Sequence, residues 1–400
     1  MKPHQYRPET EAVRGGTDLG RKNGPLATPI YQTSTFESAD VAAAIECSSS
    51  DTFYTRYGNP TVSVAEGAIA ELEGADRALL FASGMGAVTT AVMALVKSGD
   101  HIVAQRDIYG GTTKFLSAWL PKLGVETTFV DSNEFGEYAR AMRPTTRLLY
   151  LESPTNPTLK IVDLHKAVAL AKQHDLITMI DSTFATPINQ RPIEFGVDLV
   201  IHSGTKYFGG HSDLICGVLA GRLDLIERIH DTRTTLGVVM DPHAAWLLLR
   251  GIKTLAVRVQ RQNENALRIA RFLSGHAGVR QVYYPFLESH SQYELAVKQM
   301  RGGGGMLSFE MEGSADDARR LVESLRLFTL AVSLGGVDSL VTLPRYSSHA
   351  MISEEQRKKM GVSDGLIRVS VGIENADDLI ADLGQAFAAV SSCRHHAHVG

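Results

Sequence analysis

The feature that most constrains the fold is a regular alternation of short apolar runs with amphipathic stretches. The apolar runs cover 78–82, 101–105, 127–131, 147–152, 176–181, 198–202 and 217–221. The segments between them repeat apolar residues at helical spacing, as in VTTAVMALV and DLHKAVALAKQH. Strand–helix alternation with runs that are apolar on both faces predicts a mostly parallel sheet covered on two sides by helices. Ligands bind such sheets at the carboxyl ends of their strands.

The remaining segments predict an arm, a second domain and a tail. The first residues are rich in Thr, Ser, Gly and Pro, so we expect an extended arm over 1–60. The alternating segment forms a large domain over 61–255, and a long helical pattern over 242–272 links it to the next domain. Fewer strands mixed with helices predict a smaller α+β domain over 256–390. We expect a disordered tail over 391–400.

Composition argues against several classes of function. The 400 residues carry 40 basic and 44 acidic side chains, with no long run of one sign, which disfavours nucleic-acid and membrane-surface binding. Three scattered cysteines, Cys47, Cys216 and Cys393, are too few for a disulfide framework or a metal cluster. No apolar run is long enough to span a bilayer. The sequence therefore predicts a soluble, cytoplasmic protein that binds neither nucleic acid nor membrane.

Two predicted strand ends carry groups suited to an anionic ring compound. At FASGMGA (81–87), a strand enters a helix through small residues, and the backbone N–H groups there would form a seat for a phosphate. A purely structural turn is the alternative, and Thr89 stands where a dinucleotide fingerprint needs its last glycine. Asp181 closes the run LITMID. It is either a helix cap or the acceptor for a protonated ring nitrogen.

A lysine and a tyrosine complete this set. Lys206 lies among small and hydroxyl residues in VIHSGTKYFGGHSD, where partial desolvation would lower the pKa of its amine enough for attack on a carbonyl. A solvated loop lysine is the alternative. Tyr109 follows the run HIVAQ and is either a packed loop residue or an aromatic that stacks on a planar ring. Together these are the parts of a pyridoxal 5′-phosphate (PLP) site. His202 and His211 lack metal-ligand spacing, so we expect no metal.

With these motifs in place, the chain resembles the cystathionine γ-synthase/γ-lyase family, the PLP enzymes of cysteine and methionine metabolism that include methionine γ-lyase. The motifs that carry the resemblance are YTRYGNPT (54–61), SGMGA (83–87), YGGT (109–112), ESPTNP (152–157), DSTFATP (181–187), HSGTKYFGGHSD (202–213), LRGIKTL (249–255), SLGGVDSL (333–340) and IRVSVGIE (367–374). The resemblance implies PLP-dependent fold type I, like that of aspartate aminotransferase. It also implies a homotetramer, a dimer of dimers whose active sites are shared across the interface.

The resemblance implies roles for individual residues. Lys206 resembles the Schiff-base lysine, Asp181 the partner of the pyridine nitrogen, and Tyr109 the ring-stacking tyrosine and a candidate acid. The expected phosphate contacts from the same subunit are Ser83, Gly84, Met85, Ser203 and Thr205. Tyr54 and Arg56 resemble phosphate contacts that reach in from the neighbouring subunit. Arg368 resembles the arginine that binds the carboxylate of a small amino-acid substrate, with help from Asn156 and Ser333.

The expected reaction is γ-elimination on a sulfur amino acid, giving a thiol, 2-oxobutanoate and ammonia. The alternatives are γ-replacement by a cystathionine γ-synthase or O-acylhomoserine sulfhydrylase, a dinucleotide-binding oxidoreductase, and a non-catalytic protein of the same fold. Gly111 stands where methionine γ-lyases typically carry a cysteine, and Asp338 where members often carry a glutamate. Arg345 and Tyr346 are bulkier than usual and could narrow or charge the substrate mouth. These departures leave the leaving-group preference open.

Overall fold

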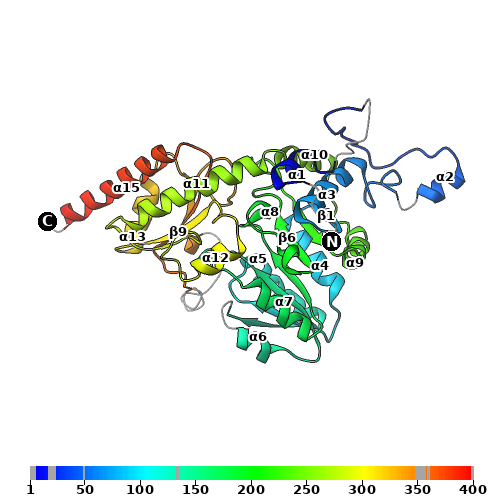
Figure 1. Cartoon of the computed structure of the whole chain (residues 1–400), viewed down its shortest axis with the longest axis horizontal. Helices are drawn as coiled ribbons and strands as arrows, with labels where there is room; N and C mark the ends of the chain where they lie inside the picture. Colours follow the sequence, from blue (N-terminus) through cyan, green and yellow to red (C-terminus); the bar gives the residue numbers. More distant parts are fainter. Residues whose placement is uncertain are drawn as a thin grey trace.

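A computed structural model describes residues 6–16, 24–47, 50–131, 135–346, 357 and 361–397, and of 393–397 only the backbone. A seven-stranded sheet and a five-stranded sheet lie side by side, linked by long helices (Figure 1). The larger sheet precedes the smaller one in the chain. This α/β architecture, with a large mostly parallel sheet and a smaller C-terminal sheet, confirms the predicted fold class.

The larger sheet contains the seven predicted runs, each within one residue of its predicted bounds. Its strands are β1 (Arg77–Phe81), β2 (His101–Gln105), β3 (Glu126–Val130), β4 (Thr146–Glu152), β5 (Ile177–Asp181), β6 (Leu199–Ser203) and β7 (Gly217–Gly221). Their spatial order is β1-β7-β6-β5-β4-β2-β3. Only β7 is antiparallel to its neighbours, so the carboxyl ends of the other strands all lie at one edge.

Both faces of this sheet are buried, because side chains alternate between two cores. On β1, Leu79 and Phe81 pack into one core and Ala78 and Leu80 into another. The first core includes residues of α4 (Gly84–Leu95) and α9 (Leu223–Leu236), and the second includes residues of α3 (Pro60–Glu73) and α10 (Pro242–Ile252). On the second face α6 (Phe135–Ala141) and α7 (Leu164–Gln173) cover the strands farther along the sheet. The side chains at the strand ends are therefore held on a rigid support.

The predicted single helix over 242–272 is two helices. α10 ends at Ile252, and α11 (Leu255–Ser274) begins after a break at Lys253 and Thr254. At this break the carbonyl of Gly251 accepts hydrogen bonds from Thr254 and from the buried guanidinium of Arg258. Arg258 also donates to the carbonyl of Tyr207, at 2.8 Å. The break thus ties the linking helices to the loop that follows β6.

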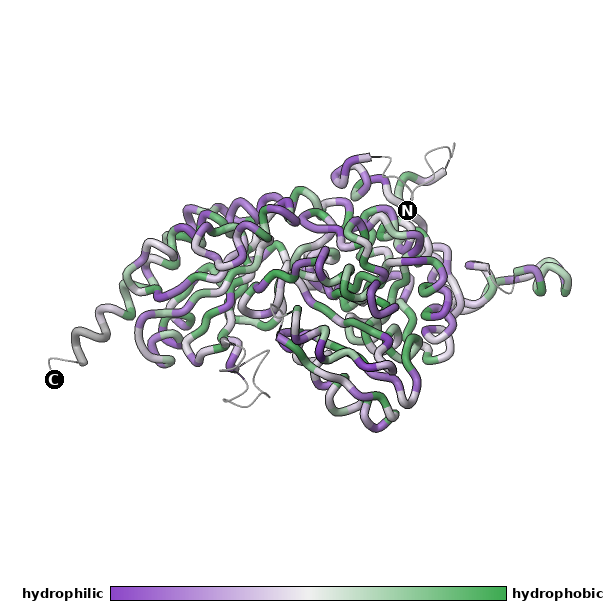
Figure 2. The backbone as a smooth tube through the Cα atoms, turned by 60° about the horizontal axis from the view of Figure 1, so that its bottom comes forward, coloured by the Kyte–Doolittle hydropathy of each residue, from purple (hydrophilic) through white to green (hydrophobic). Residues whose placement is uncertain are grey.

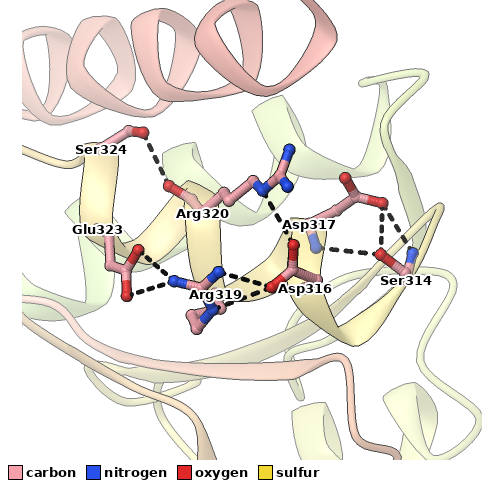
Figure 3. A network of polar contacts seen from close by, with 7 residues as sticks. All are labelled: Ser314, Asp316, Asp317, Arg319, Arg320, Glu323 and Ser324. Atoms are coloured by element: carbon pink, nitrogen blue, oxygen red, sulfur yellow. Dashed lines mark hydrogen bonds and ion pairs between the residues drawn. The ribbon is translucent and has the colours of Figure 1, made fainter. Parts of the chain in front are cut away.

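The smaller sheet packs against α11 and the C-terminal helices. Its order is β10 (Thr329–Leu330), β11 (Leu340–Thr342), β12 (Leu366–Ser370), β9 (Met306–Met311) and β8 (Val279–Tyr283). Figure 3 shows α13 (Ala315–Ser324), which begins with a capping box between Ser314 and Asp317 and carries exposed ion pairs around Arg319. Such a cap contributes about 1 kcal/mol, and exposed pairs a few tenths each.

The C-terminus differs from the sequence expectation. The backbone of α15 (Ala376–Ala397) continues through residues 391–397, where we expected a disordered tail. No glycine or proline occurs between 385 and 397 to end the helix. Residues 398–400 lie outside the described residues.

The predicted arm has two parts. α1 (Pro8–Arg14) packs on the large domain, where Glu11 forms a buried ion pair with Arg191 at 2.6 Å. The following segment carries α2 (Val41–Glu46), which buries none of its residues and stands away from both sheets (Figures 1 and 2). Apolar side chains exposed along a segment in this way indicate an interaction surface. Among the described helices, none has the length and apolarity to cross a membrane.

Candidate active site

Polar side chains of the larger sheet gather where its parallel strands end. Glu152 ends β4, Asp181 ends β5 and Ser203 ends β6, while Tyr109 follows β2. Glu152 and Asp181 are direct partners in the strand register. Lys206 lies in the turn after β6, where its N–H donates to the carbonyl of Ser203 at 3.0 Å. The edge predicted for ligand binding therefore carries the predicted residue types.

Asp181 lies partly buried, and the protein satisfies only one of its two carboxylate oxygens. Its Oδ1 accepts hydrogen bonds from the amide of Thr183 at 3.0 Å and the hydroxyl of Thr183 at 2.6 Å. Burial raises the pKa of Asp181, and the hydrogen bonds from Thr183 and the nearby His202 oppose that rise. Its Oδ2 accepts no hydrogen bond from the described residues, so this oxygen can receive a proton donor from a ligand.

The amine of Lys206 lies between the two domains. Its Nζ donates to the Oγ of Ser333 at 2.7 Å. Burial lowers the pKa of Lys206 to about 8, and the cationic Arg368 adds to this decrease. A much larger fraction of these amines is therefore neutral near pH 7.5 than at an ordinary lysine pKa. Lys206 is thus prepared to act as a nucleophile and a base.

Arg368, on β12 of the smaller sheet, faces this amine. Its Nη1 donates to Oδ1 of Asn156 and its Nη2 to the carbonyl of Ser333, both at 3.1 Å. Burial lowers the pKa of Arg368 to about 10, which leaves the guanidinium charged at neutral pH. Ser333 has a φ of +89°, a strained conformation for a serine, and it bonds to both cations. The structure therefore brings Lys206, Arg368, Asn156 and Ser333 together.

A seat for an anion lies at the N-terminus of α4. Ser83 caps this helix, since its Oγ accepts from the amide of Gly86 at 3.0 Å. A Cβ on Gly84 would lie 3.2 Å from the Oγ of Ser203, so the backbone approaches that hydroxyl closely. The Ser203 hydroxyl has no protein partner among the described residues, whereas that of Thr205 bonds to the backbone of Cys216. Free backbone N–H groups and this hydroxyl suit a phosphate.

Tyr109 lies beside this seat with its ring half exposed. Its amide donates to Oε2 of Glu152 at 2.7 Å. A Cβ on Gly111 would lie 2.5 Å from Cε1 of Tyr109 and 3.0 Å from the Sδ of Met85. A side chain at 111 would therefore displace the tyrosine ring. The glycine that departs from the methionine γ-lyase pattern permits the observed ring position.

Two predicted residues lie elsewhere in this chain. Arg56, in the arm, donates to the carbonyl of Thr234 at 2.8 Å and to the hydroxyl of Tyr57 at 3.2 Å. The ring of Tyr54 lies next to the Arg56 guanidinium and is 40% exposed. Neither contacts Lys206 or the α4 seat. Their predicted partner belongs to a neighbouring subunit, so a single chain does not bring them to its own site.

Three residues that depart from the family pattern lie at or near the protein surface. The guanidinium of Arg345 is paired with Asp364 at 2.7 Å, which offsets the charge that we expected at the substrate mouth. Tyr346 is 60% exposed and packs against Arg345. Asp338 is exposed. Because the charge of Arg345 is paired, the exposed ring of Tyr346 changes this surface more than Arg345 does.

Sequence reasoning missed Thr183 and Glu152. Thr183 fixes Asp181, and a hydroxyl two residues after a strand-end aspartate is a common local signal. Glu152 ends a buried apolar strand, the same signal that drew attention to Asp181 one strand away. The histidines are engaged by the protein: His202 bonds to Glu73 at 2.5 Å and His211 to the carbonyl of Gly209 at 2.8 Å. Within the described ranges no cluster of metal-binding side chains occurs.

The site fits PLP chemically. It offers an amine with a lowered pKa, a carboxylate oxygen without a hydrogen-bond donor, a helix N-terminus beside a free hydroxyl, and an exposed aromatic ring. These are the groups that an aldehyde, a protonated ring nitrogen, a phosphate and a ring face require. The guanidinium of Arg368 adds a site for a second, carboxylate-bearing molecule.

The environment of Lys206 predicts its reactivity with pH. In the apoprotein, reductive methylation of Lys206 by formaldehyde should rise with pH through a midpoint near 8, because only the neutral amine attacks the aldehyde. Arg368→Met should move this midpoint upward, because removing the nearby cation removes a charge repulsion that destabilises the protonated amine. Peptide-resolved mass spectrometry measures both, with the exposed Lys172 as internal control. A Lys206 midpoint equal to that of Lys172 would contradict the burial argument.

Comparison with known proteins gives a consistent result. A family model described as Cys/Met metabolism PLP-dependent enzyme matches residues 9–388. The chain is 43% identical to a cystathionine gamma-lyase of Bacillus subtilis, over 94% of this chain and 98% of the relative. It is 42% identical both to an L-methionine gamma-lyase of Fusobacterium nucleatum, over 94% and 96% of the two chains, and to a cystathionine beta-lyase of Lactococcus lactis, over 94% and 98%.

A solved structure agrees with these relatives. The crystal structure of cystathionine gamma-lyase from Lactobacillus plantarum complexed with L-serine superposes with a TM-score of 0.91. It is 39% identical in sequence and covers 96% of this chain and 100% of that one. The similarity therefore includes both sheets and the edge at which the candidate site lies.

Proposed function

The chain belongs to the family of Cys/Met metabolism PLP-dependent enzymes, and on that premise we propose that it catalyses γ-elimination on a sulfur amino acid. Membership makes it a PLP-dependent carbon–sulfur lyase. The γ-position of the cleavage rests on the similarity to a cystathionine gamma-lyase at 43% identity and to an L-methionine gamma-lyase at 42%. The observation that supports lyase chemistry in the site itself is the shared contact at Ser333. Lys206 donates to its hydroxyl and Arg368 to its carbonyl, so the group that moves protons lies beside the group that binds a carboxylate.

Several residues would hold the cofactor. Lys206 would bind its aldehyde carbon, Asp181 would pair with its ring nitrogen, and Tyr109 would contact its ring. Ser83, Gly84, Met85, Ser203 and Thr205 would contact its phosphate. When bound, PLP acts as an electron sink for the α-carbon of an amino acid. Burial raises the pKa of Asp181, so a protonated ring nitrogen beside it would offset the cost of its charge.

The substrate end of the site positions an amino acid for proton transfer. Arg368 binds the α-carboxylate with Asn156 and Ser333 beside it, which fixes the α-carbon near Lys206. The Nζ of Lys206 removes the α-proton and then helps to mobilise a proton from the β-carbon. Tyr109 donates a proton to the leaving sulfur. Breaking the bond between the γ-carbon and sulfur gives a thiol, and water completes the release of 2-oxobutanoate and ammonia.

β-Elimination is the second candidate. Cystathionine beta-lyases are as similar to this chain as L-methionine gamma-lyases are, at 42% identity. In that reaction the bond between the β-carbon and sulfur breaks, so a three-carbon keto acid is formed instead of a four-carbon one. The same amine and guanidinium serve both reactions. The two reactions therefore differ in whether the sulfur of the bound amino acid is carried by its β-carbon or by its γ-carbon.

A product assay tests the proposed function. L-Cystathionine, L-methionine and acylated homoserines are supplied separately, with and without an added thiol. We expect 2-oxobutanoate from cystathionine or methionine without thiol. Pyruvate from cystathionine would overturn γ-elimination in favour of β-elimination. Thioether formed only from acylated homoserine and thiol would show that the enzyme is a γ-replacement enzyme.

We further propose the homotetramer that the family resemblance implies, with the arm over 1–60 completing the site of a neighbouring subunit. In this proposal residues 61–255 form the PLP-binding domain and residues 256–390 form the C-terminal domain. The arm supports this proposal because its apolar residues are exposed: Leu26 is 91% and Val41 78% accessible. Tyr54 and Arg56 lie on the same segment and have no site of their own to serve.

Mixing two defective variants tests the shared site. Arg56→Ala should raise the PLP concentration needed for activity about tenfold or more, because a charged contact to phosphate is lost. Lys206→Ala should be inactive. Refolded together at limiting PLP, the two variants should recover activity, since half of random dimers are mixed and each has one intact site. The recovered activity should therefore reach at most about a quarter of the wild-type activity. No recovery above the Arg56→Ala protein alone would argue that each site is built from one chain.

A further inference from the structure

We propose that Glu152 is a positioning residue that couples the tyrosine over the cofactor to the arginine that binds the substrate carboxylate. This inference rests on the proposed function of the site, because Tyr109 and Arg368 take their roles from it. It goes beyond that function by assigning a role to a side chain that would touch neither molecule.

The carboxylate of Glu152 joins two loops. Its Oε2 accepts from the amide of Tyr109 at 2.7 Å, and its Oε1 accepts from the amide of Asn156 at 3.1 Å. Asn156 in turn accepts from Nη1 of Arg368 at 3.1 Å. One side chain thus connects the residue beside the cofactor ring with the residue that orients the guanidinium.

The connection continues to the catalytic amine. Arg368 donates to the carbonyl of Ser333, and the hydroxyl of Ser333 accepts from Lys206 at 2.7 Å. Hydrogen bonds thus connect the residues from Tyr109 to Lys206. Within this series only Glu152 bonds both to the loop that contains Tyr109 and to the loop that contains Asn156. A shift of Glu152 would therefore move the ring-stacking and carboxylate-binding groups together.

The two loops have other contacts that hold Glu152 in place. The amide of Glu152 donates to Oε1 of the buried Gln105 at 3.0 Å. Asp107 and Lys160 form an ion pair at 2.5 Å across the same loops. These contacts hold the backbone on both sides of the carboxylate, whose two oxygens each reach one donor.

This carboxylate is costly to keep. It is 5% exposed, and no cation among the described residues pairs with it. Burial raises the pKa of Glu152 well above its usual value, and the neighbouring Asp181 raises it further. The hydrogen bonds from Tyr109 and Asn156 oppose this rise. An apolar side chain would avoid the cost but would leave one buried and one partly buried N–H donor unsatisfied, which explains why an acceptor with two oxygens is required here.

The substitution Glu152→Gln tests the proposal, with Asp382→Asn as its matched control. A glutamine retains one acceptor oxygen and presents an NH₂ group to the other backbone N–H. Asp382 is also 5% exposed and also accepts from two backbone amides, those of Arg326 and Leu327, but it lies in the smaller domain away from the site. Both variants therefore lose one buried acceptor. Only in Glu152→Gln does that acceptor connect the loop of Tyr109 with the loop of Asn156.

Four quantities are measured for each purified protein. They are thermal unfolding of the apoprotein, the dissociation constant of PLP, the circular dichroism of the bound cofactor, and the dissociation constant of glycine by spectral titration. Glycine has no β- or γ-carbon, so its binding does not depend on which elimination the enzyme performs. If the wild-type enzyme fails the product assay, the proposed function fails while these measurements still decide the role of Glu152.

We expect Glu152→Gln to weaken both PLP and glycine about tenfold and to reduce the cofactor circular dichroism, since each loop loses its fixed acceptor. Asp382→Asn should leave all three within twofold while lowering thermal stability by a similar amount. Equal ligand affinities and circular dichroism in Glu152→Gln and wild type would overturn the proposal. If Glu152→Gln does not fold, Glu152→Asp, which keeps the charge on a shorter side chain, is measured against the same two outcomes.

Discussion

Replacing Lys206 with alanine is expected to abolish carbon–sulfur bond cleavage and covalent attachment of PLP. The variant loses the nucleophile for the cofactor and the base for the α-proton, so the rate should fall by at least about 10⁴-fold. Borohydride reduction of the wild-type holoenzyme should bleach its yellow colour and leave a pyridoxyl group on the peptide that contains Lys206. The alanine variant should show neither effect.

Lys172→Ala serves as the control. This exposed lysine on α7 carries the same charge and lies outside the strand ends. It should retain wild-type activity, colour and labelling. A pyridoxyl adduct on another lysine of the wild-type protein, or an active Lys206→Ala enzyme, would remove the basis of the proposed site.

Replacing Arg368 is expected to cause the second largest loss. Arg368→Met removes a buried guanidinium, leaving Asn156 and the carbonyl of Ser333 without their donor. Loss of a buried, charged hydrogen-bonding partner costs about 2–5 kcal/mol, so kcat/KM should fall by about 30-fold to about 4,000-fold, chiefly through KM. Arg368→Lys keeps the charge without the fork and should recover only part of that loss.

Two ligands separate a carboxylate-binding role from general damage to the site. Glycine should bind Arg368→Met at least about a hundredfold more weakly, whereas methylamine, the same amine without a carboxylate, should bind both proteins alike. Arg280 on β8 carries an exposed guanidinium that pairs with Glu312, and Arg280→Met should change neither affinity. Equal losses for glycine and methylamine would show that Arg368 acts through the fold rather than through the carboxylate.

The large sheet was predictable because every one of its strands is a separate apolar run. Burial on both faces forces continuous apolar residues, and the segments between the runs carry helical periodicity. The break between α10 and α11 was not predictable, because it depends on a carbonyl of Gly251 that bonds to Arg258 in the folded chain. The helical extension of α15 beyond 390 was missed because a terminal, His-rich composition was read as a tail.

The site was predictable where a residue ends a strand and less so where contacts cross between domains. Asp181 and Lys206 follow apolar runs directly, which is visible in a single sequence. Arg368 and Ser333 reached the site through the family resemblance alone, since they lie in another sheet and nothing local in the sequence brings them near Lys206. Glu152 had the same local signal as Asp181. Its importance depends on two backbone amides that only the folded loops bring together.

The arm has a practical consequence for following assembly in solution. Its residue Cys47 directly follows α2 and is half-buried, whereas Cys216 is fully buried and burial raises its thiol pKa. Once Cys393 is replaced by serine, a maleimide dye should attach selectively to the arm. Emission from that dye would then report in real time on subunits meeting and separating, at concentrations far below those needed for scattering or sedimentation.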